Sequence, residues 1–359
     1  MNSSFNYNLV LLGRELRQIN QADLAKFSSI TQGHLSKIEN GLTEPSESVV
    51  KQIAGALGFP ESFFYQSDPI YGLPISVHPM HRKKANTGQY LLEFVHAQIN
   101  LRLIHLRRLL KSVNIKKQFE IPKFDIDEYN GDIEHIAELV RRTWYLPKGP
   151  LQNLTESIEQ AGGLIIWADF STAPIDGISY SIPDLPPCIF LNQNQPADRM
   201  RFSLAHELGH LVMHRNPPPE MEDQAHKFAS ALLMPLTDIR GAFSGRITLP
   251  RLASLKPIWH VSIQSLIMRA SSMGVISATQ SRYLWQQINS AKLRFQEPPE
   301  LDFSHEEPKI LQTIFKFHTD KLGYSTDEIA KMLKIRPSEL IQLYPFLKTY
   351  QKKQLRLVS

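Results

Sequence analysis

The sequence predicts a multidomain protein with an all-helical N-terminal unit, a central α+β unit and a small helical C-terminal segment. Short apolar-periodic stretches, each preceded by a capping residue, fill residues 8–66. From Phe124 onward, strand-like apolar runs alternate with longer helical patterns. A capping box opens a further helical pattern at Ser325. The 359 residues are enough for two or three domains, each with its own core.

Composition excludes several classes of protein. A hydrophobic content of 42% and a charged content of 21% are typical of ordinary globular domains. The single cysteine, Cys188, excludes an intrachain disulfide and a cysteine-based zinc cluster. No apolar run approaches the ~18 residues that cross a bilayer, and the first residues lack the pattern of a secretion signal. We therefore expect a cytoplasmic protein with no membrane partner.

The net charge of +5 is unevenly distributed along the chain. Residues 1–68 hold five Lys/Arg against seven Asp/Glu, a net of −2. Residues 80–120 hold nine Lys/Arg against two Glu, a net of +7. This second stretch is either a surface for an anionic partner or a solvated helix face.

The N-terminal unit has the spacing of a helix-turn-helix. Asn20 can cap a helix over residues 21–27, and Thr31, after a short turn, can cap another over residues 32–39. A further helix follows Ser46. Two short helices joined by a three-residue turn form the motif that many DNA-binding proteins use.

These residues closely resemble the Cro/lambda-repressor-like (XRE) DNA-binding domain over about residues 8–66. The matching positions are Gln21, Leu24, Ala25, Leu35, Ser36, Ile38, Glu39, Gly41, Pro45, Ile53, Ala54, Leu57 and Gly58.

The resemblance implies that the third helix enters the major groove of a double-stranded DNA operator. It implies a phosphate contact for Gln21. Four residues would face base edges: Thr31, Gln32, His34 and Lys37. Glutamine can pair with adenine and lysine can reach guanine. The alternative is a helical protein-interaction module without DNA.

Residues 69–123 are predicted to form a basic linker followed by a long helix from Gln89 to Lys111. An apolar stripe along this helix can pack within the chain or pair with its twin in a dimer. Because repressors of the XRE class usually bind two-fold operators, a homodimer is expected.

Residues 124–300 are predicted to form an α+β domain. Helical patterns cover residues 133–144 and 151–161, and strands are expected at 164–167, 175–180 and 188–191. Asp198 can cap a long helix, and a second helix covers residues 220–233. If the middle strand lies at the sheet edge, it could align an extended peptide.

The first of these two helices carries the motif His206-Glu207-Leu208-Gly209-His210. Histidines at i and i+4 lie on one helix face, about 6 Å apart along the axis, and can bind one zinc ion. Glu207 falls beside the open coordination position and can take a proton from water. The alternative is a buried helix with two incidental histidines.

A catalytic zinc site needs a third protein ligand. Glu222 and His226 are four residues apart on the second helix and share a face, so both could approach the metal. His214 is a further candidate. Asp223 lies about 100° off that face and is expected to be solvated.

The two helices look like those of the ImmA/IrrE metallopeptidases. The matching positions are Arg199, Arg201, His206, Glu207, His210, His214, Glu222, Ala225, Phe228, Ala229, Leu232 and Pro235. The resemblance implies a zincin-like zinc endopeptidase in which Glu207 is catalytic and Glu222 is the third metal ligand. Gln224 stands where many relatives carry a second glutamate.

Residues 301–359 are predicted to form a helical segment that is structural, forms a dimer or makes a second nucleic-acid contact. The fusion suggests a DNA-binding transcriptional regulator that cleaves a repressor-like protein, or itself, in a stress or mobile-element response. Two alternatives are open. One is a transcription factor whose metal domain is structural or sensory, and the other is the antitoxin component of a toxin–antitoxin pair.

Overall fold

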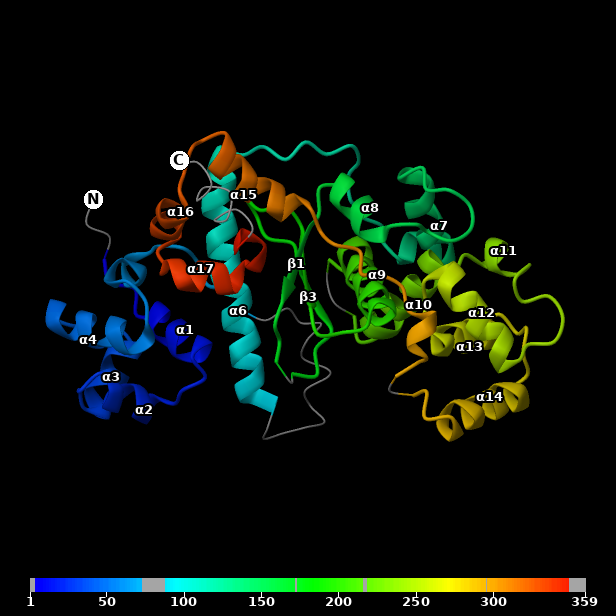
Figure 1. Ribbon diagram of the computed structural model, residues 1–359, viewed down its shortest axis with the longest axis horizontal. Coiled ribbons are helices and arrows are strands. Elements are labelled where there is room, and N and C mark those ends of the chain that lie inside the picture. Colours follow the sequence, from blue (N-terminus) through cyan, green and yellow to red (C-terminus); the bar gives the residue numbers. More distant parts are fainter. Residues whose placement is uncertain (1–3, 73–87, 172, 216–217, 295, 349–359) are drawn as a thin grey trace, which may run out of the picture.

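The computed structural model describes residues 4–72, 88–171, 173–215, 218–294 and 296–348. The N-terminal helices lie at one end of the molecule, a small sheet lies in the middle, and α12 (Leu249–Trp259), α13 (Ile263–Ser272) and α14 (Ala278–Ser290) lie at the other end (Figure 1). This arrangement confirms the multidomain prediction. Among the described helices, none is both long and apolar enough to span a bilayer.

The N-terminal unit is all-helical, as predicted. Its elements are α1 (Asn8–Leu16), α2 (Gln21–Phe27), α3 (Gln32–Glu39), α4 (Glu47–Leu57) and the 3-10 turn η1 (Glu61–Tyr65). The side chain of Asn20 accepts a hydrogen bond from the backbone N–H of Asp23, and Thr31 accepts one from His34. Both expected caps are therefore confirmed, and they fix where the two helices of the motif begin.

Helix α6 (Gly88–Leu109), extended by η3 (Leu110–Ser112), lies between the N-terminal unit and the sheet (Figure 1). Its apolar stripe is buried inside the chain: Val95 and Ile99 are fully buried and Leu103 is 1% exposed. Intrachain packing thus accounts for the stripe, and the predicted homodimer would have to use another surface.

The basic residues of α6 do not form the free face that charge counting predicted. Arg102 is 4% exposed and donates to the carbonyl of Gln98 one turn earlier. Arg108 pairs with Asp68 at 2.7 Å. Since arginine stems are apolar, both side chains pack inward while their charges find local acceptors. Residues 80–87 of this basic stretch lie outside the described residues.

The sheet consists of β1 (Leu164–Ala168), β2 (Gly177–Tyr180) and β3 (Cys188–Asn192) in the order β1-β3-β2. Strand β3 pairs parallel with β1 and antiparallel with β2. Alternate residues point to opposite faces. Consequently Ile166 joins the core shared with α6, while Ile189 joins the core shared with the catalytic-motif helix. Strand β2 lies at an edge of the sheet.

That helix is α9 (Ala197–Met213), and it packs against α10 (Met221–Leu233). A Cβ on Gly209 would lie 3.0 Å from the ring of Phe228, so glycine allows this close approach. The predicted cap was wrong: Pro196 occupies the N-cap position, and Asp198 lies inside the first turn. There it accepts from the ammonium group of Lys256 at 2.8 Å.

The remaining elements surround this pair. Before the sheet come η4 (Asp127–Tyr129), α7 (Ile133–Thr143) and α8 (Leu154–Gln160); after α10 come α11 (Leu236–Ile239), α12, α13, α14 and η5 (Pro299–Leu301). The C-terminal segment contains α15 (Ile310–Asp320), α16 (Thr326–Leu333), α17 (Pro337–Leu343) and η6 (Pro345–Leu347). The predicted capping box, Ser325 with Glu328, is confirmed.

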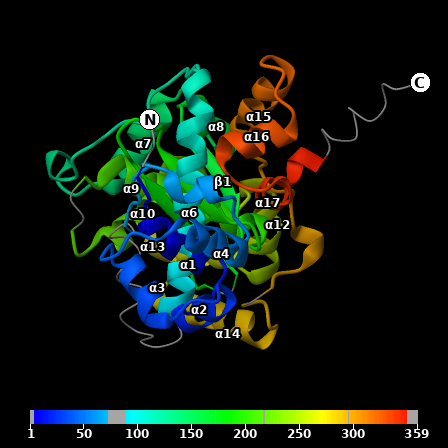
Figure 2. The ribbon, with the colours of Figure 1, turned by 90° about the vertical axis from the view of Figure 1, so that its left-hand side faces the viewer.

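The C-terminal segment packs on α6 and on the N-terminal unit (Figure 2). Arg17, which follows α1, forms a two-pronged ion pair with Glu339 of α17. His105 of α6 and the hydroxyl of Tyr344 lie 3.0 Å apart in the interior. These contacts give the segment a structural role. The predicted domain boundaries at residues 68, 123 and 300 remain a prediction.

Candidate metal centre and DNA-reading helix

Helices α9 and α10 bring three potential metal ligands together. The Nε2 atoms of His206 and His210 lie 3.1 Å apart. The carboxylate of Glu222 lies 3.3 Å from the first and 3.4 Å from the second. One ligand atom from each residue falls within a 4.8 Å group. Two histidines and a glutamate form the donor set of one class of catalytic zinc site.

The chemistry of this cluster fits a cation. Two ring nitrogens face each other, so they cannot both carry a proton on the facing side. The Oε1 atom of Glu222 is buried and accepts no hydrogen bond from the described residues. Burial alone would raise the pKa of Glu222, but the neighbouring imidazoles of His206 and His210 hold that pKa at about 2. Burial likewise opposes charging of His206, yet Glu222 and Glu207 raise its pKa overall.

Glu207 lies on the same helix, one residue after the first histidine, and is 6% exposed. The hydroxyl of Ser179 on the edge strand donates to Glu207 Oε2 at 2.7 Å. Strand β2 can come this close because residue 177 is glycine: a Cβ there would lie 3.0 Å from Cγ of Glu207. The edge strand therefore holds the carboxylate in place beside the His/His/Glu cluster.

A second line of hydrogen bonds leads outward from the cluster. His210 Nδ1 lies 2.9 Å from His214 Nδ1, and His214 Nε2 lies 3.0 Å from Gln224 Oε1. Burial, followed by the charge of His210, lowers the pKa of His214 to about 4. His214 thus contacts a ligand of the cluster without joining it.

The other candidates also lie outside the cluster. The ring of His226 packs against Phe202 at 4.8 Å, and its centroid is 6.5 Å from that of His206. Asp223 is exposed, as expected. Ser179 and the bonding role of Gln224 were missed by sequence reasoning, because both depend on contacts between elements. The one local signal was the glycine two residues before Ser179.

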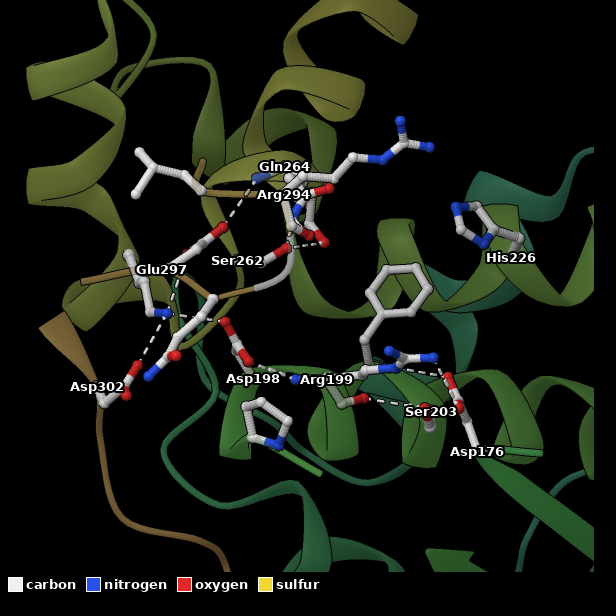
Figure 3. Close-up of a pocket in the computed structure, with 16 residues that line it drawn as sticks. Asp176, Asp198, Arg199, Ser203, His226, Ser262, Gln264, Arg294, Glu297 and Asp302 are labelled. Carbon is white, nitrogen blue, oxygen red and sulfur yellow. Dashed lines mark hydrogen bonds and ion pairs between the residues drawn. The ribbon is translucent and has the colours of Figure 1, made fainter. Parts of the chain in front are cut away.

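A cavity of about 650 Å³ opens one helical turn from the cluster. Phe202, four residues before the first histidine, and His226, four after Glu222, both line it. The buried Lys256 ammonium also lines the cavity and is shared by Asp198, Glu297 and Asp302, the three carboxylates labelled in Figure 3. These ion pairs join α9 and α12 to the chain on both sides of η5. The cavity has a mixed polar and apolar lining and borders both α9 and α10.

The DNA-reading helix predicted in the N-terminal unit is α3. Thr31, Gln32 and Lys37 are exposed on it, and His34 is half-buried. Gln21 is not free, since its amide donates to Glu39 at 2.7 Å. Glu39 also pairs with Arg14 at 2.9 Å, which ties α1, α2 and α3 together. The proposed base-reading side chains thus share one surface, while Gln21 also has a structural bond.

A helix-turn-helix unit joined to an α+β unit with a His/His/Glu cluster defines the class: a DNA-binding domain fused to a metallohydrolase-like domain. Comparison with family models specifies both parts. Residues 158–271 match the IrrE N-terminal-like domain, and residues 13–64 match the helix-turn-helix family. The chain therefore combines an XRE-type helix-turn-helix domain with an ImmA/IrrE-like metallopeptidase domain. No curated protein matches the chain.

Proposed function

We propose that this chain is a cytoplasmic DNA-binding transcriptional regulator carrying a zinc-dependent endopeptidase that cleaves a regulatory protein. The observation that carries the proposal is the convergence of His206, His210 and Glu222 within 4.8 Å. The buried carboxylate of Glu207 lies beside them. Catalytic zinc sites need such a three-ligand set with one open position and a nearby base.

Each residue has a role in the proposed reaction. His206, His210 and Glu222 hold the zinc. When bound, zinc supplies a Lewis acid that polarises the scissile carbonyl and acidifies the attacking water. Glu207 accepts the proton of that water and delivers it to the departing amine. The Ser179 hydroxyl keeps one carboxylate oxygen oriented and leaves the other free for this transfer.

The edge strand and the cavity support a polypeptide substrate. An extended peptide can add to an edge strand through main-chain hydrogen bonds, and β2 lies at the sheet edge next to Glu207. A side chain one turn away can enter the cavity beside Phe202 and His226. Since an XRE-type domain occupies the same chain, we propose a repressor-like protein, or a second copy of this chain, as the substrate.

The DNA-binding half of the proposal depends on α3. Exposed Thr31, Gln32 and Lys37, with His34 beside them, can reach base edges in the major groove of an operator. Gln21, at the start of α2, is proposed to contact a phosphate with the part of its amide that Glu39 leaves free.

The proposed endopeptidase activity is tested by asking whether the wild-type protein cleaves a second, inactivated molecule of the same protein. Zinc-loaded protein is incubated, with and without operator DNA, with a tagged Glu207→Gln copy and separately with casein. Fragments are identified by mass spectrometry. We expect fragments that require Glu207 and disappear after chelation. If wild-type and Glu207→Gln protein give the same fragments from both substrates, the endopeptidase is ruled out.

A Glu222→Ala variant separates the enzyme from a transcription factor with a structural metal. Loss of zinc with unchanged operator binding supports a separable peptidase. Loss of both supports a metal that holds the fold together.

A further inference from the structure

A chain of three side chains runs from the proposed zinc ligand His210 to Gln224 on the neighbouring helix. Nδ1 of His210 lies 2.9 Å from Nδ1 of His214. Nε2 of His214 lies 3.0 Å from the amide oxygen Oε1 of Gln224. His210 is 7% exposed, and the other two side chains are half-buried. The inner end of the series, at His210, is therefore shielded from water, whereas His214 and Gln224 border a cavity at its outer end.

The chemistry of the three groups fixes where each proton lies. The atom that faces His214 is the amide oxygen of Gln224, which only accepts. His214 must therefore donate through Nε2, and a neutral imidazole that donates there accepts at Nδ1. His210 must then donate through its own Nδ1 to His214. As a result, Nε2 of His210 keeps its lone pair on the side of His206 and Glu222.

We propose that His214 and Gln224 are positioning residues that set the tautomer and ring orientation of His210 for zinc. The inference rests on the proposed function, because it takes His210 to be a zinc ligand. Metal-bound histidines generally donate their second N–H to a neighbouring group, and loss of that group weakens metal binding. Here the acceptor is a second histidine, whose own tautomer is set by an amide.

The rotamer of the Gln224 amide sets which group donates and which accepts in each of these hydrogen bonds. If the amide turned over, its NH₂ group would donate to His214, and donor and acceptor would exchange in each bond. His210 would then carry its proton on Nε2, between the ring and the cation. A carboxylate at position 224 has no donor and permits one direction only. Gln224→Glu should therefore preserve the hydrogen bonds from His210 to residue 224. Gln224→Met, whose thioether is a poor acceptor, should break them.

The experiment measures zinc affinity by competition with a chromophoric chelator, in the full-length protein. We expect Gln224→Met to bind zinc about 10- to 100-fold more weakly than wild type. Gln224→Glu should bind at least as tightly as wild type. His214→Phe should show a loss similar to that of Gln224→Met. Because Gln224 and His214 act through the same series of hydrogen bonds, the double variant should lose no more zinc affinity than His214→Phe alone.

Lys227→Met, an exposed change on the same helix, is the matched control and should leave zinc affinity unchanged. Cobalt(II) absorption supplies a second readout, since a reoriented His210 alters the ligand field, and circular dichroism of the metal-free variants checks folding. Equal affinities and spectra for wild type, Gln224→Met and Gln224→Glu would overturn the inference and leave the zinc site standing. If wild-type protein binds no zinc, the proposed function and this inference fail together.

Discussion

Glu207 is 6% exposed, and the Ser179 hydroxyl is the one side-chain donor to its carboxylate among the described residues. A buried carboxylate loses its hydration, and each remaining donor therefore counts heavily. The Ser179 hydroxyl bonds Oε2 and leaves Oε1 without this donor. At the scale of the residue, the stability of the fold and the proposed catalytic role of Glu207 thus depend on the same bond.

Ser179→Ala should lower the free energy of unfolding by about 1–3 kcal/mol, because it leaves a buried carboxylate without its donor. Urea denaturation of the metal-free protein measures this. Zinc affinity should change little, because Ser179 contacts none of the three proposed ligands.

Ser157→Ala is the matched control, since its hydroxyl bonds a main-chain carbonyl on α8, away from the centre. A double-mutant cycle with Glu207→Gln should give a coupling energy of about 1 kcal/mol or more. Strictly additive losses would contradict the proposed bond.

The sequence predicted the part of the candidate site that lies on a single helix. His206, Glu207 and His210 lie on two turns of one helix, so their geometry follows from spacing. Spacing left Glu222, His226 and His214 open as third ligands, because the pairing of two helices is not a local property. Resemblance pointed to Glu222, and the structure places its carboxylate against both histidines. The role of Ser179 depends on a sheet edge that spacing does not describe.

At the scale of the element, α3 is short, and its ends are fixed by the Thr31 cap and by Glu39 bonds to its neighbours. Because the backbone of α3 is already ordered, the helix can present Gln32 and Lys37 to one DNA groove without folding on binding. The negative charge of residues 1–68 gives little general attraction to phosphates. Base contacts should consequently account for a large share of the affinity.

Gln32→Ala should weaken operator binding by about 1–3 kcal/mol and relax the sequence preference at one base pair. Fluorescence anisotropy on an operator obtained by in vitro selection measures both effects. Lys51→Ala, an exposed change on α4, serves as the control and should alter binding little. If both variants bind selected and scrambled DNA as wild type does, α3 is not the reading helix.

The short capped helices were predicted well, because their signals are a capping side chain followed by an apolar period. The helices between residues 236 and 290 were not. Helix α12 contains Pro257, which local rules treat as a breaker. The first N–H groups of α13 are bonded by the distant carboxylate of Glu297. Two local signals could have been used: the Ser262 side chain, which caps α13, and the Ser277–Gln280 capping box of α14.

At the scale of the molecule, a single apolar cluster joins the helix-turn-helix, α6, one face of the sheet and the C-terminal helices. Sequence could not show this, because such packing joins residues hundreds of positions apart. The same holds for charge: Arg108 of α6 pairs with Asp68 across the fold, so this arginine is not part of a free basic face. The helix-turn-helix unit is therefore packed against the body that carries the His/His/Glu cluster.

His105 lies in that shared interior and provides a test of it. Its ring is fully buried, with Nδ1 3.0 Å from the hydroxyl of Tyr344. Burial first, and then the charges of Arg108 and Arg102, keep its pKa well below the ordinary value of 6.5. In the unfolded chain the imidazole gains a proton below about pH 6.5, whereas in the folded protein it stays neutral. Unfolding therefore takes up a proton, and stability must fall as the pH falls through 6.5.

Urea denaturation with a chelator at pH 7 and pH 5 measures this loss. Wild-type protein should lose up to about 1.4 kcal/mol per pH unit more than His105→Gln, which retains a hydrogen-bonding group but does not titrate. The losses that other buried histidines contribute are the same in both proteins and cancel. His135→Gln, at a partly exposed ring, should follow wild type. If His105→Gln follows wild type as well, the ring is hydrated, and the C-terminal segment does not seal the interior of α6.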